Sequence, residues 1–255
     1  VEFHTEQVRD PAREVRVLAV APDGGPDSGP DSATREIPSQ IHHVHTEEGR
    51  HCCRLYFLAD LSPSSTHTWL VLYGNPEAAP PEYETDMLVT GQEYALTVEN
   101  TFYRMELAPT TGHLKSVVFR QGAAEFSGYG PPMDPGIIGD GKHGVEGSVH
   151  WNPDWSDAHT GRYRVTNWLR PPHHTVIRGP VYTRVERWGH PILGLGPCGK
   201  YQKVRARVVY TFWASQPYVI MESSLEVLED VRFRDCRNDE WVGMGQSMPQ
   251  QAWMT

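Results

Sequence analysis

The sequence predicts an all-β protein made of two units, of which the first is a small β-sandwich. Three observations support this fold class. Short segments in which apolar and polar residues alternate recur along the chain, as in strands that bury one face. Turn-forming residues separate these segments, since 23 glycines and 21 prolines are spread over 255 residues. No segment shows a convincing helical pattern, so we expect helix to be minor throughout.

The first unit is predicted to span residues 1–88. Two tracts are expected to lie outside its sheets. Residues 22–39 are rich in Pro, Gly, Asp and Ser and are predicted to form a mobile surface loop. Residues 75–85 (NPEAAPPEYET) are predicted to form an exposed connector to the second unit. The expected strands follow the alternating or apolar segments at residues 14–21, 40–45, 54–61 and 68–73.

The second unit is predicted to span residues 89–255 and to be nearly continuous strand. A turn is expected at residues 109–112. Residues 189–202 are rich in glycine but lack the Gly-Lys-Ser/Thr ending of a phosphate-binding loop, so we expect a long hairpin loop there. The predicted strands lie at residues 94–98, 101–107, 114–120, 163–169, 175–178, 181–188, 204–212, 218–227 and 231–236.

The start of the second unit resembles a known family. The run VENTFYRMEL (residues 98–107), followed by TGHLKSV (residues 111–117), is similar to the opening hairpin of galactose-mutarotase-like β-supersandwich domains. Such domains occur in sugar epimerases, in several polysaccharide lyases and in the C-terminal parts of large glycosidases. The resemblance is strongest over residues 94–120. It implies that residues 89–255 form a mutarotase-like β-supersandwich and that the protein acts on or binds carbohydrate.

Residues 139–168 form the chemically richest stretch of the chain. They combine three histidines, three tryptophans, two arginines and a tyrosine with four acidic residues. Gly139, Gly141, Gly144, Gly147 and Pro153 disfavour a helix, so we expect a long binding loop over most of the stretch. Flat aromatic faces beside arginine side chains suit a sugar-binding surface. The alternative interpretation is a tryptophan-rich loop folded over a sheet edge without a function of its own.

One stretch therefore contains every group that β-elimination of a uronate glycoside requires. The reaction needs a base that removes the C5 proton, an acid that protonates the leaving oxygen and a group that neutralises the carboxylate. We predict His143 or His150 as the base, Tyr163 as the acid and Arg162 or Asn152 as the neutralising group. The residues predicted to bind the remaining sugar units are Trp151, Trp155, Trp168, Arg164, Arg234, Asn238, Glu240 and Trp241.

Two other chemistries remain open for the same stretch. Hydrolysis would need two flanking carboxylates, and Asp154 and Asp157 are candidates, although an Asp-x-x-Asp pattern in a loop favours turn formation. A single metal ion, Zn or Ca, is the alternative cofactor. Its candidate ligands are His143, Glu146, His150, Asp154, Asp157 and His159.

Histidine and cysteine patterns elsewhere point to a metal less strongly. His43 and His45 share one face of a predicted strand, but the sequence shows no third ligand nearby. The cysteines match no zinc-binding spacing. Cys52 and Cys53 would point to opposite faces of a strand and so would not bond to each other. The other two, Cys198 and Cys236, form either a disulfide or free buried thiols.

The net charge of −9 is distributed unevenly. Residues 1–99 carry six basic and 17 acidic groups, whereas residues 160–210 carry ten basic groups and one acidic group. The basic segment predicts a surface that faces a polyanion, unless alternating strands simply expose their polar face to water. Nucleic acid is not expected as a partner because no nucleic-acid-binding motif is present. A membrane is not expected either, because no run of about 18 apolar residues occurs.

These observations predict an extracellular or secreted carbohydrate-active enzyme, a polysaccharide lyase that cleaves an acidic, uronate-containing polysaccharide or oligosaccharide by β-elimination. Two alternatives stay open: a non-catalytic β domain of a larger glycoside hydrolase, and a glycan-binding module without catalysis. The chain does not begin with Met, so we expect a processed form or a piece of a longer protein, with further domains among its partners.

Overall fold

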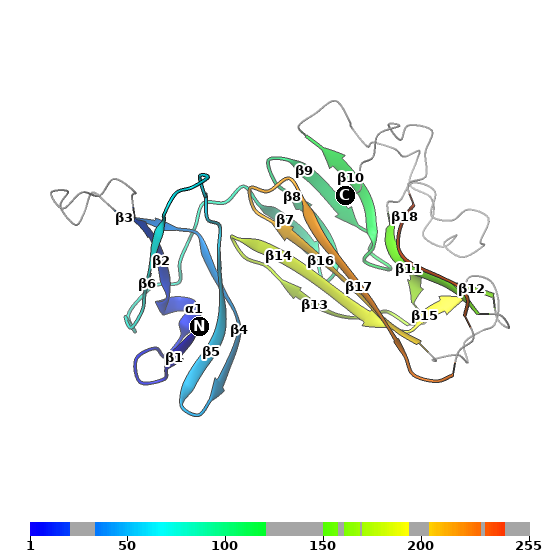
Figure 1. Cartoon of the computed structure of the whole chain (residues 1–255), viewed down its shortest axis with the longest axis horizontal. Coiled ribbons are helices and arrows are strands. Elements are labelled where there is room, and N and C mark those ends of the chain that lie inside the picture. The colour runs from blue at the N-terminus through cyan, green and yellow to red at the C-terminus, as the bar shows by residue number, and fades with distance from the viewer. Residues whose placement is uncertain are drawn as a thin grey trace. The chain divides into compact units, whose positions relative to one another are not determined.

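The computed structural model of the 255-residue chain describes residues 1–20, 34–120, 150–157, 161–168, 170–193, 204–230 and 233–242. For residues 115–117, 119, 150–157, 161–167, 191–193, 204 and 233–242 the description covers the backbone alone. The described residues form 18 strands and one four-residue helix, and every strand pairing whose register is described is antiparallel. The predicted all-β fold class is therefore confirmed (Figure 1).

The chain divides into two compact units. The first comprises Val1–Thr85 and Gly179–Tyr182, and the second comprises Asp86–Arg178 and Thr183–Thr255. Residues 75–85, which the sequence marks as a connector, contain neither helix nor strand and run to the end of the first unit's main segment. The return of residues 179–182 to the first unit was not foreseen.

The first unit is a small sandwich of two three-stranded sheets (Figure 1). Its core is formed by Phe3, Val8, Val15 and Cys53, against which partly buried side chains of both sheets pack, among them Leu55. A short helix, α1 (Pro11–Glu14), begins where Asp10 accepts a hydrogen bond from the Ala12 amide and proline occupies the first helical turn. One sheet has the order β1 (Glu2–His4), β5 (Arg50–Phe57), β4 (Ser39–Glu47), and the other has the order β3 (Thr34–Ile37), β2 (Arg16–Val20), β6 (Thr68–Leu72).

The end of the predicted surface loop at residues 22–39 belongs to a sheet. Thr34–Ile37 forms β3, which pairs with β2 from Val17–Ile37 to Val20–Thr34. The Pro/Gly-rich composition of the tract therefore does not extend to its last residues, where Thr and Ile favour strand. Residues 21–33 of that tract lie outside the described residues.

Gln40 attaches residues 179–182 to the first unit. Its buried side-chain oxygen accepts hydrogen bonds from the backbone amides of Val181 (3.3 Å) and Tyr182 (3.0 Å). Gly179 lies so close to the Gln40 amide group that an added Cβ atom would collide with it. The hydroxyl of Thr85 donates a hydrogen bond to the carbonyl oxygen of Pro180 (2.9 Å), which also holds residues 179–182 in place.

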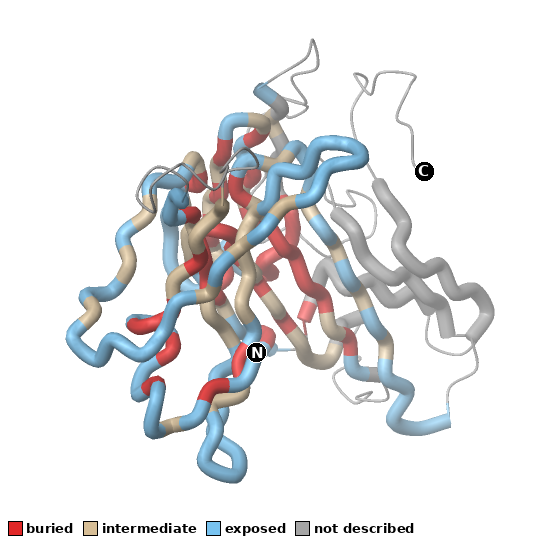
Figure 2. The backbone as a smooth tube through the Cα atoms, turned by 60° about the vertical axis from the view of Figure 1, so that its left-hand side comes forward, coloured by how far each residue is buried: buried red, intermediate tan, exposed pale blue. Residues whose placement is uncertain are grey.

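The second unit contains three four-stranded sheets. Two of them face each other as a sandwich, since Tyr103 of the first contacts Phe212 of the second with ring centroids 6.4 Å apart. Figure 2 shows their facing strands rich in buried residues. The first has the order β10 (Leu114–Phe119), β9 (Tyr103–Leu107), β8 (Ala95–Glu99), β7 (Leu88–Gln92), and the second has the order β13 (His173–Ile177), β14 (Tyr182–Gly189), β16 (Val204–Trp213), β17 (Val219–Val227).

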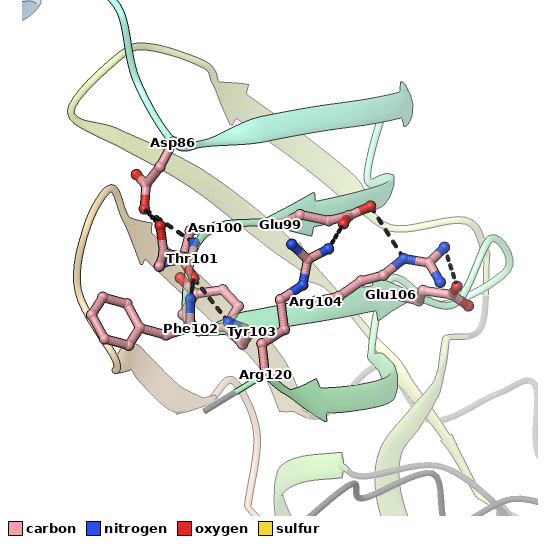
Figure 3. A network of polar contacts seen from close by, with 9 residues as sticks. All are labelled: Asp86, Glu99, Asn100, Thr101, Phe102, Tyr103, Arg104, Glu106 and Arg120. Carbon is pink, nitrogen blue, oxygen red and sulfur yellow. Dashed lines mark hydrogen bonds and ion pairs between the residues drawn. The ribbon is translucent and has the colours of Figure 1, made fainter. Parts of the chain in front are cut away.

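The turn between β8 and β9 is held to the other sheet by a buried asparagine. The Asn100 Oδ1 accepts the amides of Phe102 (2.9 Å) and Tyr103 (3.0 Å), and its Nδ2 donates to the carbonyls of Trp213 (3.0 Å) and Gln216 (2.9 Å). Figure 3 shows Asn100 and its neighbours in this turn. Asn100 therefore satisfies four backbone groups of two sheets at once, which gives the VENTFY run a structural role.

An aspartate reinforces the same junction. The Asp86 carboxylate accepts hydrogen bonds from the amide and hydroxyl of Thr101 (3.1 and 2.8 Å; Figure 3) and from those of Ser215 (2.8 and 3.1 Å). Burial alone would raise the pKa of Asp86, but the hydrogen bonds from Thr101 and Ser215 outweigh it, so the pKa lies below its ordinary value.

Candidate functional site

The third sheet of the second unit brings together almost all of the predicted site residues (Figure 1). Its order is β15 (Pro191–Leu193), β12 (Gly161–Trp168), β11 (His150–Asp157), β18 (Phe233–Val242). Of the predicted residues, only His143 is missing from these strands, and it lies outside the described residues, as do residues 139–149 as a whole.

The second half of the chemically rich stretch contains two paired strands rather than the long loop that we expected. β11 pairs with β12 from Asp154–Arg164 to Asp157–Gly161. Tyr, Val, Thr and Trp make up half of residues 161–168, and these residue types favour strand. Pro153, which argued against regular structure, coincides with a register shift between β11 and β18, where a missing amide hydrogen is tolerated.

The register of β11 with β18 joins two segments about 80 positions apart in the sequence. Trp151 lies opposite Trp241, and Asn152 lies opposite Glu240. Trp155 is flanked by Tyr163 of β12 and by Cys236 of β18. The residues of the late cluster therefore lie beside the rich stretch, as sheet neighbours whose backbones are hydrogen-bonded to it.

The residues predicted to catalyse the reaction are spread along the strands instead of converging. Tyr163 lies opposite Trp155, whereas His150 lies opposite Val242 at the far end of β11. Five residues separate His150 from Trp155, which corresponds to about 16 Å at a strand rise of about 3.3 Å per residue. A base and an acid that act on adjacent atoms of one sugar unit must lie much closer together. The sheet therefore separates His150 from Tyr163 too far for this pair of roles.

Trp168 does not have the predicted role of a sugar-stacking surface. Its side chain is only 7 % exposed, and its indole N–H donates to the carbonyl oxygen of Thr111 (3.0 Å). Its ring stacks on His113, with centroids 6.1 Å apart and planes inclined by 8°. Neither ring face can receive a sugar, so the prediction for Trp168 is corrected: it belongs to the core of the second unit.

Arg187, which shares the Thr111 carbonyl with Trp168, is fully buried. Arg187 is 0 % exposed, and its Nη1 donates to the Thr111 carbonyl (2.8 Å) and contacts the Nδ1 of His113 (3.3 Å). Its guanidinium carbon lies 4.6 Å from the centroid of the Tyr210 ring, a cation–π contact. Within the described part of the chain, the Nε and Nη2 of Arg187 have no hydrogen-bond partner. Burial lowers the pKa of Arg187, and nearby Tyr210 partly offsets this.

Gly112 makes room for this arginine. The backbone of Gly112 has φ = 70°, and an added Cβ atom would collide with the Cδ of Arg187 and lie 2.9 Å from the Tyr94 ring. Only glycine satisfies both conditions at once. The Thr-Gly turn that carries the family resemblance thus has a packing reason.

Three arginines of the basic segment at residues 160–210 form ion pairs with glutamates. Arg184 and Arg207 both pair with Glu186, at 3.2 and 2.5 Å. Arg205 pairs with Glu226 of the neighbouring strand β17. Glu226 lies outside residues 160–210, so the charge of that segment does not include it. The hydrogen bond to Glu186 raises the pKa of Arg207. The described arginines of β14 and β16 therefore do not form the free polyanion-binding surface that we predicted.

The sequence suggested a metal site at residues 139–159 and, less strongly, at His43 and His45, and the outcome differs between the two. Glu146 and His159, like His143, lie outside the described residues, so a metal at residues 139–159 stays a prediction. In the first unit, the described residues include one group with metal-binding side chains, His45, Glu47 and Cys52. Sequence reasoning found His45 and missed the other two. The Glu48-Gly49 pair could have revealed Cys52, because a two-residue turn there places Cys52 opposite His45.

The cysteine predictions are settled in part. Cys52 and Cys53 are both free thiols, and Cys53 is buried while Cys52 is half-buried. Cys198 lies outside the described residues, so a disulfide between Cys198 and Cys236 stays untested. In the described ranges, no helix is long and apolar enough to cross a membrane.

Comparison with known proteins adds no assignment. No protein-family model, no curated protein and no solved structure matches the chain.

Proposed function

We propose that the protein binds an acidic glycan along the sheet formed by β12, β11 and β18. One observation carries this proposal: the backbone register aligns tryptophans, arginines and polar residues from two distant segments on three adjacent strands. Trp151 lies opposite Trp241, and Asp154 lies between Arg164 and Arg237. An extended sheet of this composition suits an extended polymer.

The residue types on these strands have complementary chemical roles in sugar recognition. Tryptophan offers a large flat apolar face on which a sugar ring packs. Arginine forms bidentate hydrogen bonds with a carboxylate, so the arginines of β12 and β18 suit the uronate groups of the polymer. Amide and carboxylate side chains accept hydrogen bonds from sugar hydroxyls.

Binding is favoured over cleavage by the way the predicted catalytic residues are spaced. A binding surface for a polymer uses residues that are spread along a strand, whereas β-elimination needs its base and acid around a single sugar unit. The positions of His150 and Tyr163, at separate places along β11 and β12, suit the first requirement better than the second. Cleavage by a lyase remains a prediction. Its base would then be one of the residues outside the described ranges.

Binding to a panel of polysaccharides tests this function. Polygalacturonate, alginate and hyaluronate represent uronate polymers, and a neutral glucan serves as the comparison. We expect calorimetry to detect binding to at least one uronate polymer and none to the glucan. The affinity should fall steeply as ionic strength rises, because exposed charges are screened beyond about 8 Å at 0.15 M salt.

Variants locate the binding surface. Replacing both Trp151 and Trp241 by alanine should weaken binding at least about 30-fold, the effect of losing about 2 kcal/mol from a central aromatic contact. Arg164→Ala should weaken binding to the uronate polymer and flatten its salt dependence. Tyr218→Ala is the matched control, because Tyr218 is 51 % exposed just before β17 and should not affect binding.

Three results would contradict or change the proposal. Absence of binding to every uronate polymer would overturn it, and so would equal loss of affinity in Tyr218→Ala and in the tryptophan variant. An ultraviolet absorbance that grows with time would show an unsaturated uronate product, and the protein would then be the lyase that the sequence predicts.

A further inference from the structure

The outer face of the sheet β1–β5–β4 gathers metal-binding side chains. Its ladders place Cys52 between His45 of β4 and Glu2 of β1. Glu47 follows two residues after His45 on the same strand, so both share a face. The ligand atoms of His45, Glu47 and Cys52 all lie within 4.8 Å of one another. This surface lies in the first unit and is independent of the proposed glycan site.

A β-bulge in β4 lies next to this grouping. The register with β5 shifts by one residue between His42 and His45, and His43 in the bulge has φ = 53°. Two residues of β4, His43 and Val44, therefore lie opposite the single residue Cys53 of β5. The bulge absorbs the extra residue of β4, while His45 stays paired with Cys52 on one face.

A tight turn keeps the hairpin in this register. Glu48 and Gly49 have φ values of 47° and 73°, as in the two-residue turns that match the twist of a hairpin. Glu47 and Arg50 are paired directly before and after the turn. The turn and the bulge together fix which residues of the two strands face each other, so the three side chains are held as neighbours by the backbone.

The histidine is oriented as metal-binding histidines usually are. The Nδ1 of His45 lies 3.3 Å from the carbonyl oxygen of His43. When Nδ1 carries the proton and donates to this carbonyl, Nε2 keeps its lone pair for a metal. A bond from the second ring nitrogen to a backbone carbonyl is the usual way in which such a histidine is fixed.

The cysteine is accessible and reduced. Cys52 is a free, half-buried thiol on the outer face. Its neighbour Cys53 points into the core with Phe3 and Val8, and burial raises the pKa of its thiol, so Cys53 is not a ligand. Only one of the two adjacent cysteines can therefore reach an ion at this face.

We propose that His45, Glu47 and Cys52 bind a zinc ion on the outer face of the β4–β5 hairpin. Sulfur and imidazole donors with one carboxylate match zinc, whereas calcium and magnesium require oxygen donors. Tetrahedral zinc sites place ligand atoms about 3.5 Å apart, so the side chains must close by about 1 Å, which exposed rotamers allow. Three protein ligands leave the fourth position to water.

Two arginines of β5, Arg50 and Arg54, lie on the same face. Arg50 pairs with Glu2 at a distance of 3.2 Å, and both side chains are more than half exposed. This ion pair offsets the charge of Arg50. The proposed site therefore has three protein ligands and does not depend on Glu2.

Metal titration of the full chain tests the site. Zinc should bind with a stoichiometry of one at this site and a Kd of about 10 μM or below, while calcium and magnesium should not bind there. Cobalt serves as a spectroscopic probe, because a thiolate ligand gives an intense charge-transfer absorption. Cys52→Ser should abolish this absorption, and His45→Ala and Glu47→Gln should each weaken zinc binding at least about tenfold. His51→Ala is the matched control on the opposite face and should bind zinc as the unchanged protein does.

A measurement on the unchanged protein guards against variants that do not fold. Zinc should slow alkylation of Cys52 by iodoacetamide at least about tenfold, whereas magnesium should not. Zinc binding that survives Cys52→Ser, or alkylation of Cys52 at the same rate with and without zinc, would overturn the proposal. Equal loss of zinc binding in His51→Ala would also overturn it, since the face of the sheet would then not matter.

Discussion

Replacing Asn100 by alanine tests whether one buried side chain holds the two facing sheets of the second unit together. Asn100 is 1 % exposed, and its amide group makes four hydrogen bonds to backbone groups at distances of 2.9–3.0 Å. The alanine variant leaves two N–H groups and two carbonyls without these partners. Water cannot enter such a site freely, so most of their cost remains.

The expected magnitude follows from the number of bonds. Each buried hydrogen bond contributes about 1 kcal/mol net, and an unpaired buried group costs about 1–3 kcal/mol. We therefore expect Asn100→Ala to lower the free energy of unfolding of the second unit by about 4 kcal/mol, at the upper end for a single substitution. Hydrogen–deuterium exchange followed by mass spectrometry suits this measurement, because it reports each unit separately in a chain that need not unfold in one step.

Thr101→Val is the matched control for Asn100→Ala. It removes the hydroxyl that donates to Asp86 (2.8 Å) at an exposed position of the same turn and leaves the Asn100 bonds in place. We expect a cost below about 1 kcal/mol. The reasoning fails if Asn100→Ala costs no more than Thr101→Val, or if the exchange of peptides from β8, β9 and β16 does not accelerate.

Two further predictions concern charged groups of the second unit. Because the pKa of Asp86 is lowered on folding, its stabilisation is present above the unfolded pKa of about 3.9 and is lost as the pH falls through the lower folded value. The stability difference between the unchanged protein and Asp86→Asn should thus be constant from about pH 5 to 8 and shrink below about pH 4; a difference that grows in acid would contradict this. Arg187→Met should be neutral or stabilising in denaturant titrations, since a fully buried guanidinium with neutral partners repays little of its desolvation, whereas Arg187→Ala should cost about 2–5 kcal/mol by leaving a cavity. Marked destabilisation of both variants alike would show that the charge of Arg187 is needed.

The fold class could be predicted because alternation and turn residues are local signals. The segments at residues 40–45 and 68–73 are strands within a few positions of their predicted bounds, as β4 and β6 show. Composition failed where it was applied to a whole tract, since residues 34–37 form β3 at the end of a Pro/Gly-rich segment. The prediction of a polyanion-facing surface was wrong for Arg184, Arg205 and Arg207, which pair with glutamates, and stays a prediction for Arg162 and Arg164. A window of sequence cannot show that Glu226, on the next strand, neutralises Arg205.

The composition of the candidate glycan site was visible in the sequence, but its arrangement was not. Trp151 and Trp241 are 90 positions apart, and only the pairing of β11 with β18 shows that they are neighbours. The same pairing places His150 and Tyr163 at separate positions along the strands, which argues against one shared sugar unit. Trp168 could not be distinguished from the other tryptophans, because its burial depends on Thr111 and His113 of another sheet.

The zinc site illustrates why the face of a strand cannot be assigned by counting residues. Strict alternation along β4 places His43 and His45 together and predicts a pair without a third ligand. The two-residue turn at Glu48-Gly49 sets the pairing on the far side of the bulge at His43. His45 therefore lies opposite Cys52, and Glu47 joins them from two positions further on. Removing His43 from the chain should restore regular pairing along the whole hairpin and leave His45 opposite Cys52, so the deletion variant should keep the zinc-dependent protection of Cys52. Loss of protection in that variant, with the hairpin still formed, would show that the turn alone does not determine the site.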